Sequence, residues 1–274
     1  MYILYNEDNL KVLKEMAENN VDCIITSPPY DDIRNYENTL NWNYEIFQEL
    51  AKQLYKVLKP GGVCVWVVAD STINGSETCN SFRQALYFKE IGFNLHDTMI
   101  YAKHNPTPNT GGGTRYQQSF EYMFVFSKGK PKTINLLLEP RRNECNDKRT
   151  FRIRKFNRNK QGEFAQQEHL HEIKENVPRS NIWTYKVGLY NTTSDKIAFE
   201  HPAIFPEQLA KDHILTWTNE NDIVLDPFMG SGTVGKMCKE LNRTFIGIEI
   251  VEKYYNIAGE RIRGYKVQEE LNLE

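Results

Sequence analysis

The residues Thr26-Ser27-Pro28-Pro29-Tyr30 directly follow an apolar run, Val21–Ile25, that predicts a buried strand. The two prolines carry no N–H group and hold φ at about −65°, so the chain leaves the strand in one fixed direction. The Ser27 hydroxyl and the Pro28 carbonyl can accept hydrogen bonds, and Tyr30 supplies a flat ring. This corner suits a planar heteroaromatic amine that is gripped at its NH2 group and stacked on one face. A nucleobase fits that description.

A second motif lies near the other end of the chain. The segment Asp222–Thr233 predicts an apolar strand and a glycine-bearing turn, and a helix that ends near Leu241 follows. Gly230 and Gly232 allow a tight turn and a close approach of the backbone, while the helix directs N–H groups toward negative charge. The run lacks the third spaced glycine of a dinucleotide site and the Gly-Lys-Ser/Thr of a phosphate-binding loop. The pattern therefore predicts a nucleotide-type crevice.

Acidic residues stand at the ends of two predicted strands. Thr244–Ile250 predicts a buried strand with Glu249 at its end, about twenty residues after Asp226, where a carboxylate can hold two ribose hydroxyls. A ligand with an ammonium group at one end, a sugar in the middle and no pyrophosphate suits two such acids. S-adenosylmethionine has these features.

Together, the two motifs resemble those of the amino-methyltransferases of DNA, which use S-adenosylmethionine to methylate an exocyclic nitrogen of cytosine or adenine. In that family the catalytic motif is Asp/Asn/Ser-Pro-Pro-Tyr/Phe, and the cofactor motif carries a Phe and a glycine pair. The catalytic motif precedes the cofactor motif here, with a basic segment between them, which resembles the β group. Ser27 is similar to the form common in N4-cytosine enzymes, whereas adenine enzymes mostly carry Asp.

The resemblance assigns roles to individual residues. It implies the catalytic residues Ser27, Pro28, Pro29 and Tyr30. It implies a cofactor site formed by Phe205, Pro206, Asp226, Pro227, Phe228, Gly230, Ser231, Gly232, Thr233 and Glu249. Within that site Phe205, Pro206 and the following helix would border the methionine part of S-adenosylmethionine. The expected chemistry needs no metal and no covalent intermediate.

Alternating strands and helices predict an α/β sheet with its ligands at the carboxyl ends of the strands. The expected elements are Ile3–Tyr5, Asp22–Thr26, Val63–Ala69, Asn94–Tyr101 and Glu121–Ser127 as strands, and Leu10–Ala17, Tyr44–Leu58 and Ser81–Ile91 as helices, with Pro60-Gly61-Gly62 stopping the second helix. The resemblance implies a Rossmann-like methyltransferase fold with a mixed, mostly parallel seven-stranded sheet and an inserted target-recognition region. We expect residues 1–129 to form the catalytic half of the core, 130–199 the target-recognition region, and 200–274 the S-adenosylmethionine-binding half.

The positive charge is concentrated in the middle of the chain. The whole chain has a net charge of −2, but Lys128–Lys186 holds 15 Lys and Arg against 7 Asp and Glu, interleaved with aromatic and Asn residues. Such a segment suits phosphate contact with some reading of base edges. We therefore expect double-stranded DNA as the partner, with DNA-binding residues Arg141, Arg142, Arg149, Arg152, Arg154, Lys155 and Arg158.

Composition bounds the other possibilities. No apolar stretch approaches about 18 residues, and the first residues lack the basic start of a signal peptide, so we expect a soluble, cytoplasmic protein without membrane contact. The family resemblance implies a bacterial, archaeal or phage origin. The 5 cysteines are never spaced as Cys-x-x-Cys, which predicts reduced thiols and neither disulfides nor a zinc site. None follows a proline, which argues against the nucleophile of a cytosine-C5 methyltransferase.

Three alternatives stay open at this point. An N6-adenine DNA methyltransferase is the nearest, because a Ser pocket can also accept the adenine amine. A methyltransferase of the same fold that acts on protein or RNA is disfavoured by the Ser in the first motif position and by the basic segment. A catalytically silent DNA-binding module is disfavoured by the two intact motifs. By family analogy, a cognate restriction endonuclease and a homodimer are further candidate partners.

Overall fold

A computed structural model describes residues 1–29, 42–106, 115–141, 151–158, 164–171, 174–188 and 191–264, and for 151–158 and 164–171 it defines the backbone. The chain forms two compact units. The large unit comprises Met1–Asn135 and Asn181–Glu274, and the small unit comprises Leu136–Ser180. Nowhere in the described ranges is a helix both long enough and apolar enough to span a membrane.

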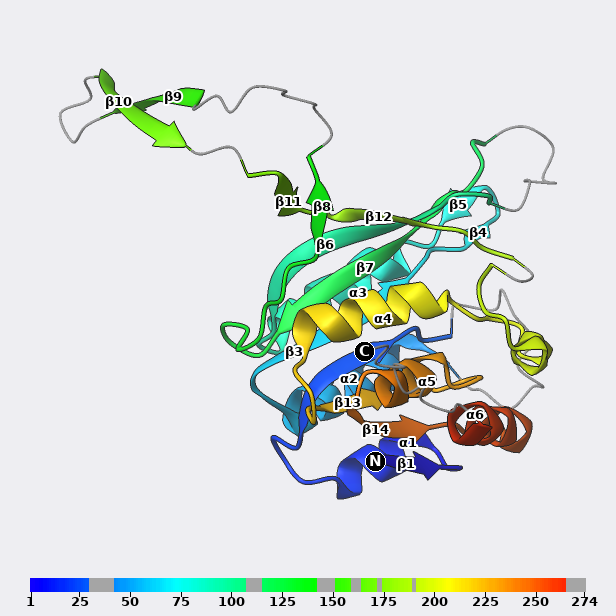
Figure 1. Ribbon diagram of the computed structural model, residues 1–274. Coiled ribbons are helices and arrows are strands. Elements are labelled where there is room, and N and C mark those ends of the chain that lie inside the picture. Colours follow the sequence, from blue (N-terminus) through cyan, green and yellow to red (C-terminus); the bar gives the residue numbers. More distant parts are fainter. Residues whose placement is uncertain are drawn as a thin grey trace, which may run out of the picture. The chain divides into compact units, whose positions relative to one another are not determined.

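The large unit is built on one twisted sheet, which contains eight strands within the described residues (Figure 1). In spatial order these are β1 (Tyr2–Tyr5), β14 (Thr244–Ile248), β13 (Ile223–Asp226), β2 (Val21–Thr26), β3 (Leu58–Val68), β7 (Phe120–Ser127), β6 (Asn94–Lys103) and β12 (Ile182–Tyr185). Only β7 runs antiparallel to its two neighbours, and all other pairs are parallel. The carboxyl ends of the remaining strands therefore meet at one edge of the sheet.

The sheet has one strand more than the seven predicted. The additional strand is β12, which comes from the segment assigned to the target-recognition region and pairs in parallel with the end of β6. Its Trp183 and Tyr185 are buried while Ile182 and Thr184 are exposed, the alternation of an edge strand with one covered face. The Tyr185 hydroxyl also donates a 2.7 Å hydrogen bond to Asp212 Oδ2, which fixes this strand to the large unit.

Helices cover both faces of this sheet (Figure 1). On one face, α1 (Asn9–Glu15) packs beside α2 (Tyr44–Val57), which packs beside α3 (Asn80–Glu90). On the other face, α4 (Glu207–Trp217), α5 (Thr233–Glu240) and α6 (Glu252–Gly264) pack in the same sequential way, and the short helix η1 (Lys196–Glu200) lies against α6. Because both faces are covered, the central strands are continuous apolar runs, as in other mostly parallel sheets.

The core is rich in aromatic rings beneath α2 and α3. The rings of Phe47, Trp66 and Phe88 lie 5.1 to 5.9 Å apart and are all fully buried. Helix α2 begins where the Asn43 side chain accepts a 2.9 Å hydrogen bond from Ile46 N, a typical helix N-cap. It ends at Val57, one residue before the predicted end, because β3 already starts at Leu58 and continues through the Pro-Gly-Gly sequence.

Within its described residues, the small unit contains two antiparallel strand pairs. Strand β8 (Leu138–Pro140) pairs with β11 (Asn176–Pro178), and β9 (Phe151–Arg158) pairs with β10 (Phe164–His171). This unit lies inside the predicted target-recognition region 130–199, whose other described residues belong to the large unit. The short hairpin of β4 (Thr72–Ile73) and β5 (Ser76–Glu77) completes the large unit.

Candidate active site

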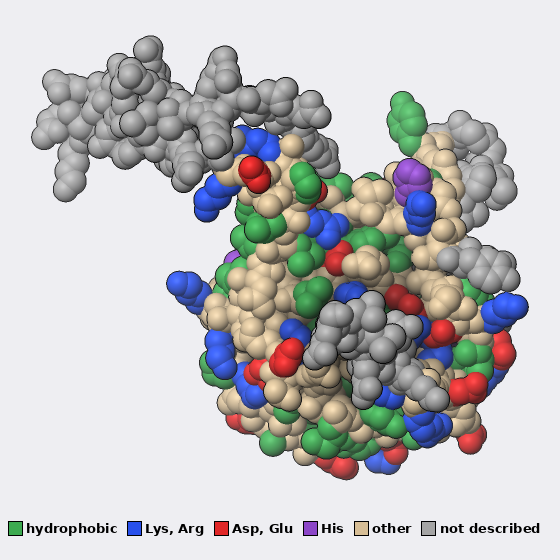
Figure 2. All heavy atoms as spheres, in the orientation of Figure 1, with side chains coloured by type: hydrophobic (Ala, Val, Ile, Leu, Met, Phe, Trp, Pro, Cys, Tyr) green, Lys and Arg blue, Asp and Glu red, His purple; other side chains and the backbone are tan. Residues whose placement is uncertain are grey.

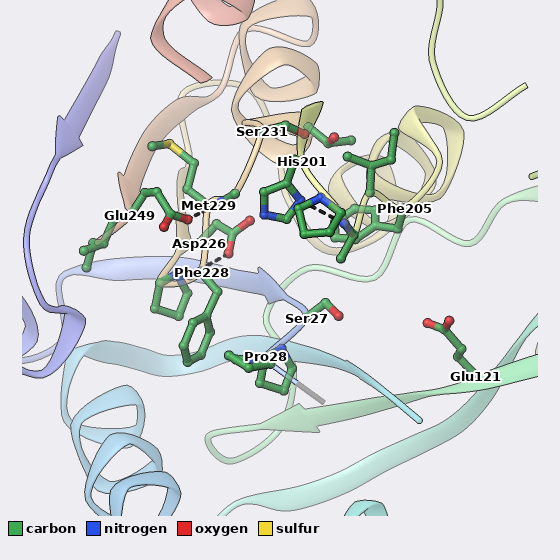
Figure 3. A pocket seen from close by; sticks show the side chains of 18 of the residues that line it. Ser27, Pro28, Glu121, His201, Phe205, Asp226, Phe228, Met229, Ser231 and Glu249 are labelled. Atoms are coloured by element: carbon green, nitrogen blue, oxygen red, sulfur yellow. Dashed lines mark hydrogen bonds between the residues drawn. The ribbon is translucent and has the colours of Figure 1, made fainter. Parts of the chain in front are cut away.

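The two motifs meet at the carboxyl edge of the sheet. Strands β2 and β13 are direct neighbours, with Cys23 and Ile24 opposite Val224 and Leu225. The residues at and after their carboxyl ends, Ser27 to Pro29 and Asp226 to Ser231, line one pocket of about 770 Å³. Figure 3 shows Asp226 and Glu249 on the same side of Ser27, with Asp226 the nearer of the two in this view. The sheet order thus joins two segments that are about 200 residues apart in the chain.

Ser27 and Pro28 extend from the end of β2 into the pocket wall. Thr26, the last residue of the strand, is fully buried, and its hydroxyl donates a 2.6 Å hydrogen bond to Asp226 Oδ1. Tyr30, the last residue of the predicted catalytic motif, lies outside the described residues. The rigid corner of the motif is therefore held directly against the second motif.

Asp226 is a buried acid whose pKa is raised well above its usual value. It is 2% exposed, and burial raises the pKa of its carboxyl from 3.8 to about 7, assisted by the nearby charge of Glu249. The hydrogen bonds from Thr26 and from Phe228 N, which is 3.1 Å from Oδ1, act in the opposite direction. A bound cation would stabilise the ionised form, so the site suits a positively charged group.

The glycine turn shapes the pocket floor. Gly230 has φ +52°, and a Cβ atom there would lie 3.0 Å from His201 Nε2, so the turn requires glycine. Its N–H group donates a 2.8 Å hydrogen bond to Glu249 Oε2. Gly232 has φ +80°, and a Cβ atom there would lie 2.8 Å from Ala258 Cβ. The second glycine therefore brings the start of α5 close to α6.

Glu249 follows β14 directly and faces the same pocket (Figure 3). Besides Gly230, Val251 N donates to its carboxylate, at 2.9 Å from Oε1, and the Glu249 N–H donates to Tyr5 O at 3.0 Å. Burial raises the pKa of the carboxyl, while these backbone donors lower it. A carboxylate fixed in this way retains acceptor capacity for the hydroxyl groups of a ligand.

Most of the predicted site residues come together in this pocket. The predicted residues that line it are Ser27, Pro28, Pro29, Phe205, Asp226, Pro227, Phe228, Gly230, Ser231, Thr233 and Glu249. Two predicted cofactor residues do not line it: Gly232 packs against α6, and Pro206 is the N-cap residue of α4. Both act on the pocket through the elements that they position.

A buried ion network lies directly behind the glycine turn. The Arg261 side chain is 1% exposed and donates to Ser231 O at 2.6 Å and to Thr233 Oγ1 at 3.3 Å. It also pairs with Asp195 and Glu207, at 3.0 and 2.8 Å, and both acids pair with Lys236 at 2.9 Å. Two cations and two anions thus balance each other while tying α4, α5 and α6 to the turn.

Sequence reasoning assigned no catalytic or cofactor-binding role to several other residues of the pocket. Asn9 Nδ2 donates a 3.1 Å hydrogen bond to Pro227 O and so connects α1 to the second motif. The His201 ring packs edge-on against Tyr254, with 4.4 Å between centroids. Lys103 and Glu121 form an ion pair in the pocket wall. Lys103 follows the predicted strand Asn94–Tyr101 and Glu121 begins the predicted strand Glu121–Ser127, which was the available sequence signal for these two residues. No predicted strand end marked Asn9 or His201.

The predicted DNA-binding residues belong to the small unit or its flanks. Arg141 is exposed, and its N–H group donates to Glu175 O at 2.9 Å. Arg152, Arg154, Lys155 and Arg158 lie on β9. Arg142 and Arg149 lie outside the described residues. On the face of the large unit drawn in Figure 2, the described acidic and basic side chains are interspersed.

The protein has the fold of the S-adenosylmethionine-dependent methyltransferases, a Rossmann-like sheet with these two motifs at its carboxyl edge. It uses S-adenosylmethionine as its cofactor. The family model of the N6/N4 DNA methylases matches residues 21–260, and the chain belongs to this family. It is 55% identical over 257 residues to the orphan methyltransferase M.BamHII of Bacillus amyloliquefaciens, covering 91% of this chain and 93% of that protein.

Solved structures share this fold. The crystal structure of the M1.HpyAVI–SAM complex is 25% identical, with a TM-score of 0.60, and the match covers 96% of this chain and all (100%) of that one. The PvuII DNA methyltransferase, described as cytosine-N4-specific, is 20% identical, with a TM-score of 0.69 over 100% of this chain and 88% of that one. The protein is therefore a DNA methyltransferase of the kind found in restriction-modification systems.

Proposed function

We propose that this DNA methyltransferase transfers the methyl group of S-adenosylmethionine to the exocyclic N4 amine of a cytosine that is flipped out of duplex DNA. The observation that carries the proposal is the position of Ser27 in the same pocket as Asp226 and Glu249. The same pocket therefore contains Ser27, which can accept a hydrogen bond from an amine, and two acids that can bind the cofactor. The Ser at the first position of the motif favours cytosine over adenine as the target.

The residues of the pocket fit the chemical groups of the cofactor. We assign Asp226 to the ammonium group, because a buried acid with a raised pKa gains most from a cationic partner. We assign Glu249 to the two ribose hydroxyls, in line with its position after β14. Phe205 and Phe228 supply apolar walls. When bound, S-adenosylmethionine supplies an electrophilic methyl group on a positively charged sulfur.

The first motif raises the reactivity of the amine. The lone pair of the cytosine amine is delocalised into the ring, so the nitrogen is a poor nucleophile. If the Ser27 hydroxyl accepts one amino hydrogen and the Pro28 carbonyl the other, the nitrogen is drawn toward tetrahedral geometry. These contacts strengthen as positive charge develops on nitrogen, so they favour the transition state over the ground state. As the N–CH3 bond forms, the S–CH3 bond breaks and its electron pair stays on the sulfur of S-adenosylhomocysteine, and the methylated amine then releases one proton to solvent. Alignment of the reacting atoms contributes as well and can be worth roughly 7–11 kcal/mol.

Entry into this pocket requires base flipping. A stacked base inside a duplex cannot reach Ser27 at the end of a buried strand, so the target nucleotide must rotate out of the helix. We assign to Tyr30 the role of replacing part of the lost stacking with its ring. The expected consequence is that Tyr30→Ala loses more activity than Tyr30→Phe, which keeps the ring; equal losses would point to the hydroxyl instead.

Nucleoside mass spectrometry tests the proposed product. DNA from a host that lacks its own methyltransferases is digested to nucleosides after expression of the protein, with a Ser27→Ala variant as the control. The proposal predicts N4-methylcytosine with the wild-type protein and none with the variant. N6-methyladenine would contradict it and establish the adenine alternative. Methylation-sensitive sequencing of the same DNA identifies the recognised sequence.

We assign DNA recognition to region 130–199, with Arg141, Arg142, Arg149, Arg152, Arg154, Lys155 and Arg158 as its DNA-binding residues. Strand β9, which carries Arg152, Arg154, Lys155 and Arg158 and pairs with β10, suits contact with phosphates. Replacing Arg152 and Arg154 by Gln should reduce the dependence of log affinity on log salt concentration by about two units of slope if both contact phosphates. An unchanged slope would indicate that Arg152 and Arg154 of β9 do not contact DNA phosphates.

A homodimer and a cognate restriction endonuclease are further proposed partners, by analogy with the family.

A further inference from the structure

The pocket has a second polar group on the far side of Ser27. Lys103 Nζ lies 2.7 Å from Glu121 Oε1, and their side chains are only 23% and 11% exposed. Both residues line the same pocket as Ser27 and Asp226. Figure 3 shows the Glu121 carboxylate facing the space on the side of Ser27 that is opposite to Asp226.

The order of the strands separates this pair from the cofactor acids. Lys103 is the last residue of β6 and Glu121 lies at the start of β7, so both stand at the carboxyl edge of the sheet. Along that edge Glu249 follows β14, Asp226 ends β13 and Ser27 follows β2. Strands β3, β7 and β6 come next in the sheet. Neighbouring strands lie about 4.8 Å apart, so β7 is about 10 Å from β2. Ser27 therefore stands between the cofactor acids and the Lys103–Glu121 pair.

The charges of the pocket differ between its two sides. Among the described residues that line it, Lys103 is the only Lys or Arg, whereas the acids are Glu7, Asp8, Glu121, Asp226 and Glu249. Asp226 and Glu249 suit the cationic cofactor, whereas Glu121 pairs with Lys103. A lysine ammonium group has three N–H donors, and the pairing with Glu121 fixes its position without using all of them. The side of the pocket beyond Ser27 thus offers a positioned hydrogen-bond donor to an acceptor atom.

We propose that Lys103 donates a hydrogen bond to the O2 carbonyl of the flipped cytosine and that Glu121 positions the ammonium group for this contact. The inference rests on the proposed function, in which Ser27 and Pro28 hold the N4 amine. The pairing edge of cytosine runs from the N4 amine through N3 to O2, so a base gripped at its amine presents O2 away from Ser27. Adenine has a C–H group at the corresponding end of its edge and gives Lys103 no acceptor. Lys103 is therefore a specificity-determining residue.

Lys103→Met combined with a modified base tests this contact. The substrates are duplexes that carry the sequence found to be methylated in the host, with either cytosine or 2-thiocytosine at the target position. Sulfur is a weak acceptor, but the base keeps its amine and N3. The wild-type protein should lose roughly 10- to 100-fold in kcat/KM on 2-thiocytosine, the range for a hydrogen bond to a charged group. Lys103→Met should lose a similar factor on cytosine but little more on 2-thiocytosine.

Three measurements exclude a merely structural effect of the substitution. Lys103→Arg, which keeps a charged donor, should retain more activity than Lys103→Met. Calorimetry should give an unchanged S-adenosylmethionine affinity for both variants. The matched control is Lys59→Met, because the Lys59–Asp22 pair has the same 2.7 Å separation but lies outside the pocket, and its turnover should match that of the wild type.

Two results would overturn the inference. One is equal sensitivity of Lys103→Met and the wild-type protein to 2-thiocytosine, since a steric effect of sulfur acts on both. The other is wild-type kcat/KM for Lys103→Met on cytosine. In either case N4-methylcytosine among the products would leave the proposed function intact. N6-methyladenine as the wild-type product would overturn both.

Discussion

The Thr26 hydroxyl donates a 2.6 Å hydrogen bond to Asp226 Oδ1, and both side chains are almost completely buried. This contact joins the last residue before the Ser-Pro-Pro corner to the first residue of the cofactor motif. Because β2 and β13 are neighbouring strands, the position of the amine acceptor is tied to the position of the cofactor acid. The single hydrogen bond therefore couples the two halves of the proposed reaction.

Thr26→Val should weaken cofactor binding. Valine keeps the shape of the side chain but removes the hydroxyl that stabilises ionised Asp226, so the pKa of Asp226 rises further. A lost hydrogen bond to a charged group corresponds to roughly a tenfold weaker affinity for S-adenosylmethionine, measured by calorimetry at pH 7. The matched control is Thr216→Val, because Thr216 donates a 2.7 Å bond to a backbone oxygen within α4. Equal losses in the two variants would contradict this role of Thr26.

The affinity for S-adenosylmethionine should increase with pH up to about 7 and then level off. Burial raises the pKa of Asp226 from 3.8 to about 7, so the empty site favours the protonated acid below that pH. An ammonium group binds the carboxylate, and binding must therefore release a proton when the pH is below about 7. Titration calorimetry in buffers of different ionisation enthalpy measures this release. Asp226→Asn should bind weakly and without this pH dependence.

The raised pKa of Asp226 also makes the stability of the cofactor-free protein depend on pH, and here stability decreases as the pH rises. Because the folded state raises the pKa of Asp226, this group stabilises the fold most below about pH 4, and the contribution is lost as the pH rises through about 7. Added cofactor should offset that loss. Thermal unfolding with and without S-adenosylmethionine should therefore differ more at pH 8 than at pH 6.

Gly232→Ala should destabilise the large unit more than Gly75→Ala. Both glycines have φ +80°, so both substitutions introduce the same backbone strain. A methyl group at position 232 would also lie 2.8 Å from Ala258 Cβ, whereas nothing lies within 4 Å at position 75. The additional overpacking corresponds to roughly 1–3 kcal/mol. Urea unfolding of the two variants measures the difference, and equal free energies of unfolding would contradict the close contact of α5 with α6.

Arg261→Met should strongly destabilise the fold and weaken cofactor binding. Removing a buried cation leaves Asp195 and Glu207 paired with Lys236 alone, and breaking such a pair costs roughly 3–5 kcal/mol. It also removes the donor to Ser231 in the cofactor turn. The control is Lys253→Met, which breaks an exposed pair with Glu200 and should change the free energy of unfolding by about 1 kcal/mol or less. Similar losses in the two variants would contradict a buried, cooperative network.

The sequence was sufficient to predict the residues with local signals. Ser27 and Asp226 were placed at strand ends by their apolar runs and by the proline and glycine turns beside them, and both strands end at the predicted residue. Helix α2 was predicted to within one residue because its apolar residues recur at helical spacing. The cofactor and the class of fold followed from these motifs.

Features that depend on contacts between distant segments could not be predicted. Strand β12 is four residues long, and only its pairing with β6 identifies it as part of the sheet. Lys103 has no motif around it, and its role depends on Glu121, which reaches it by the antiparallel pairing of β6 with β7. The Arg261 network joins side chains from four segments of the chain. Such arrangements follow from tertiary packing.

The most direct test of the account is to compare single-turnover methylation and cofactor affinity in Ser27→Ala, Asp226→Ala and Glu249→Ala. The account predicts that Ser27→Ala lowers the rate of methyl transfer by roughly 100-fold or more while its S-adenosylmethionine affinity stays at the wild-type value. The other two variants should instead lose affinity. Equal cofactor affinity in all three variants, or a wild-type rate for Ser27→Ala, would contradict it.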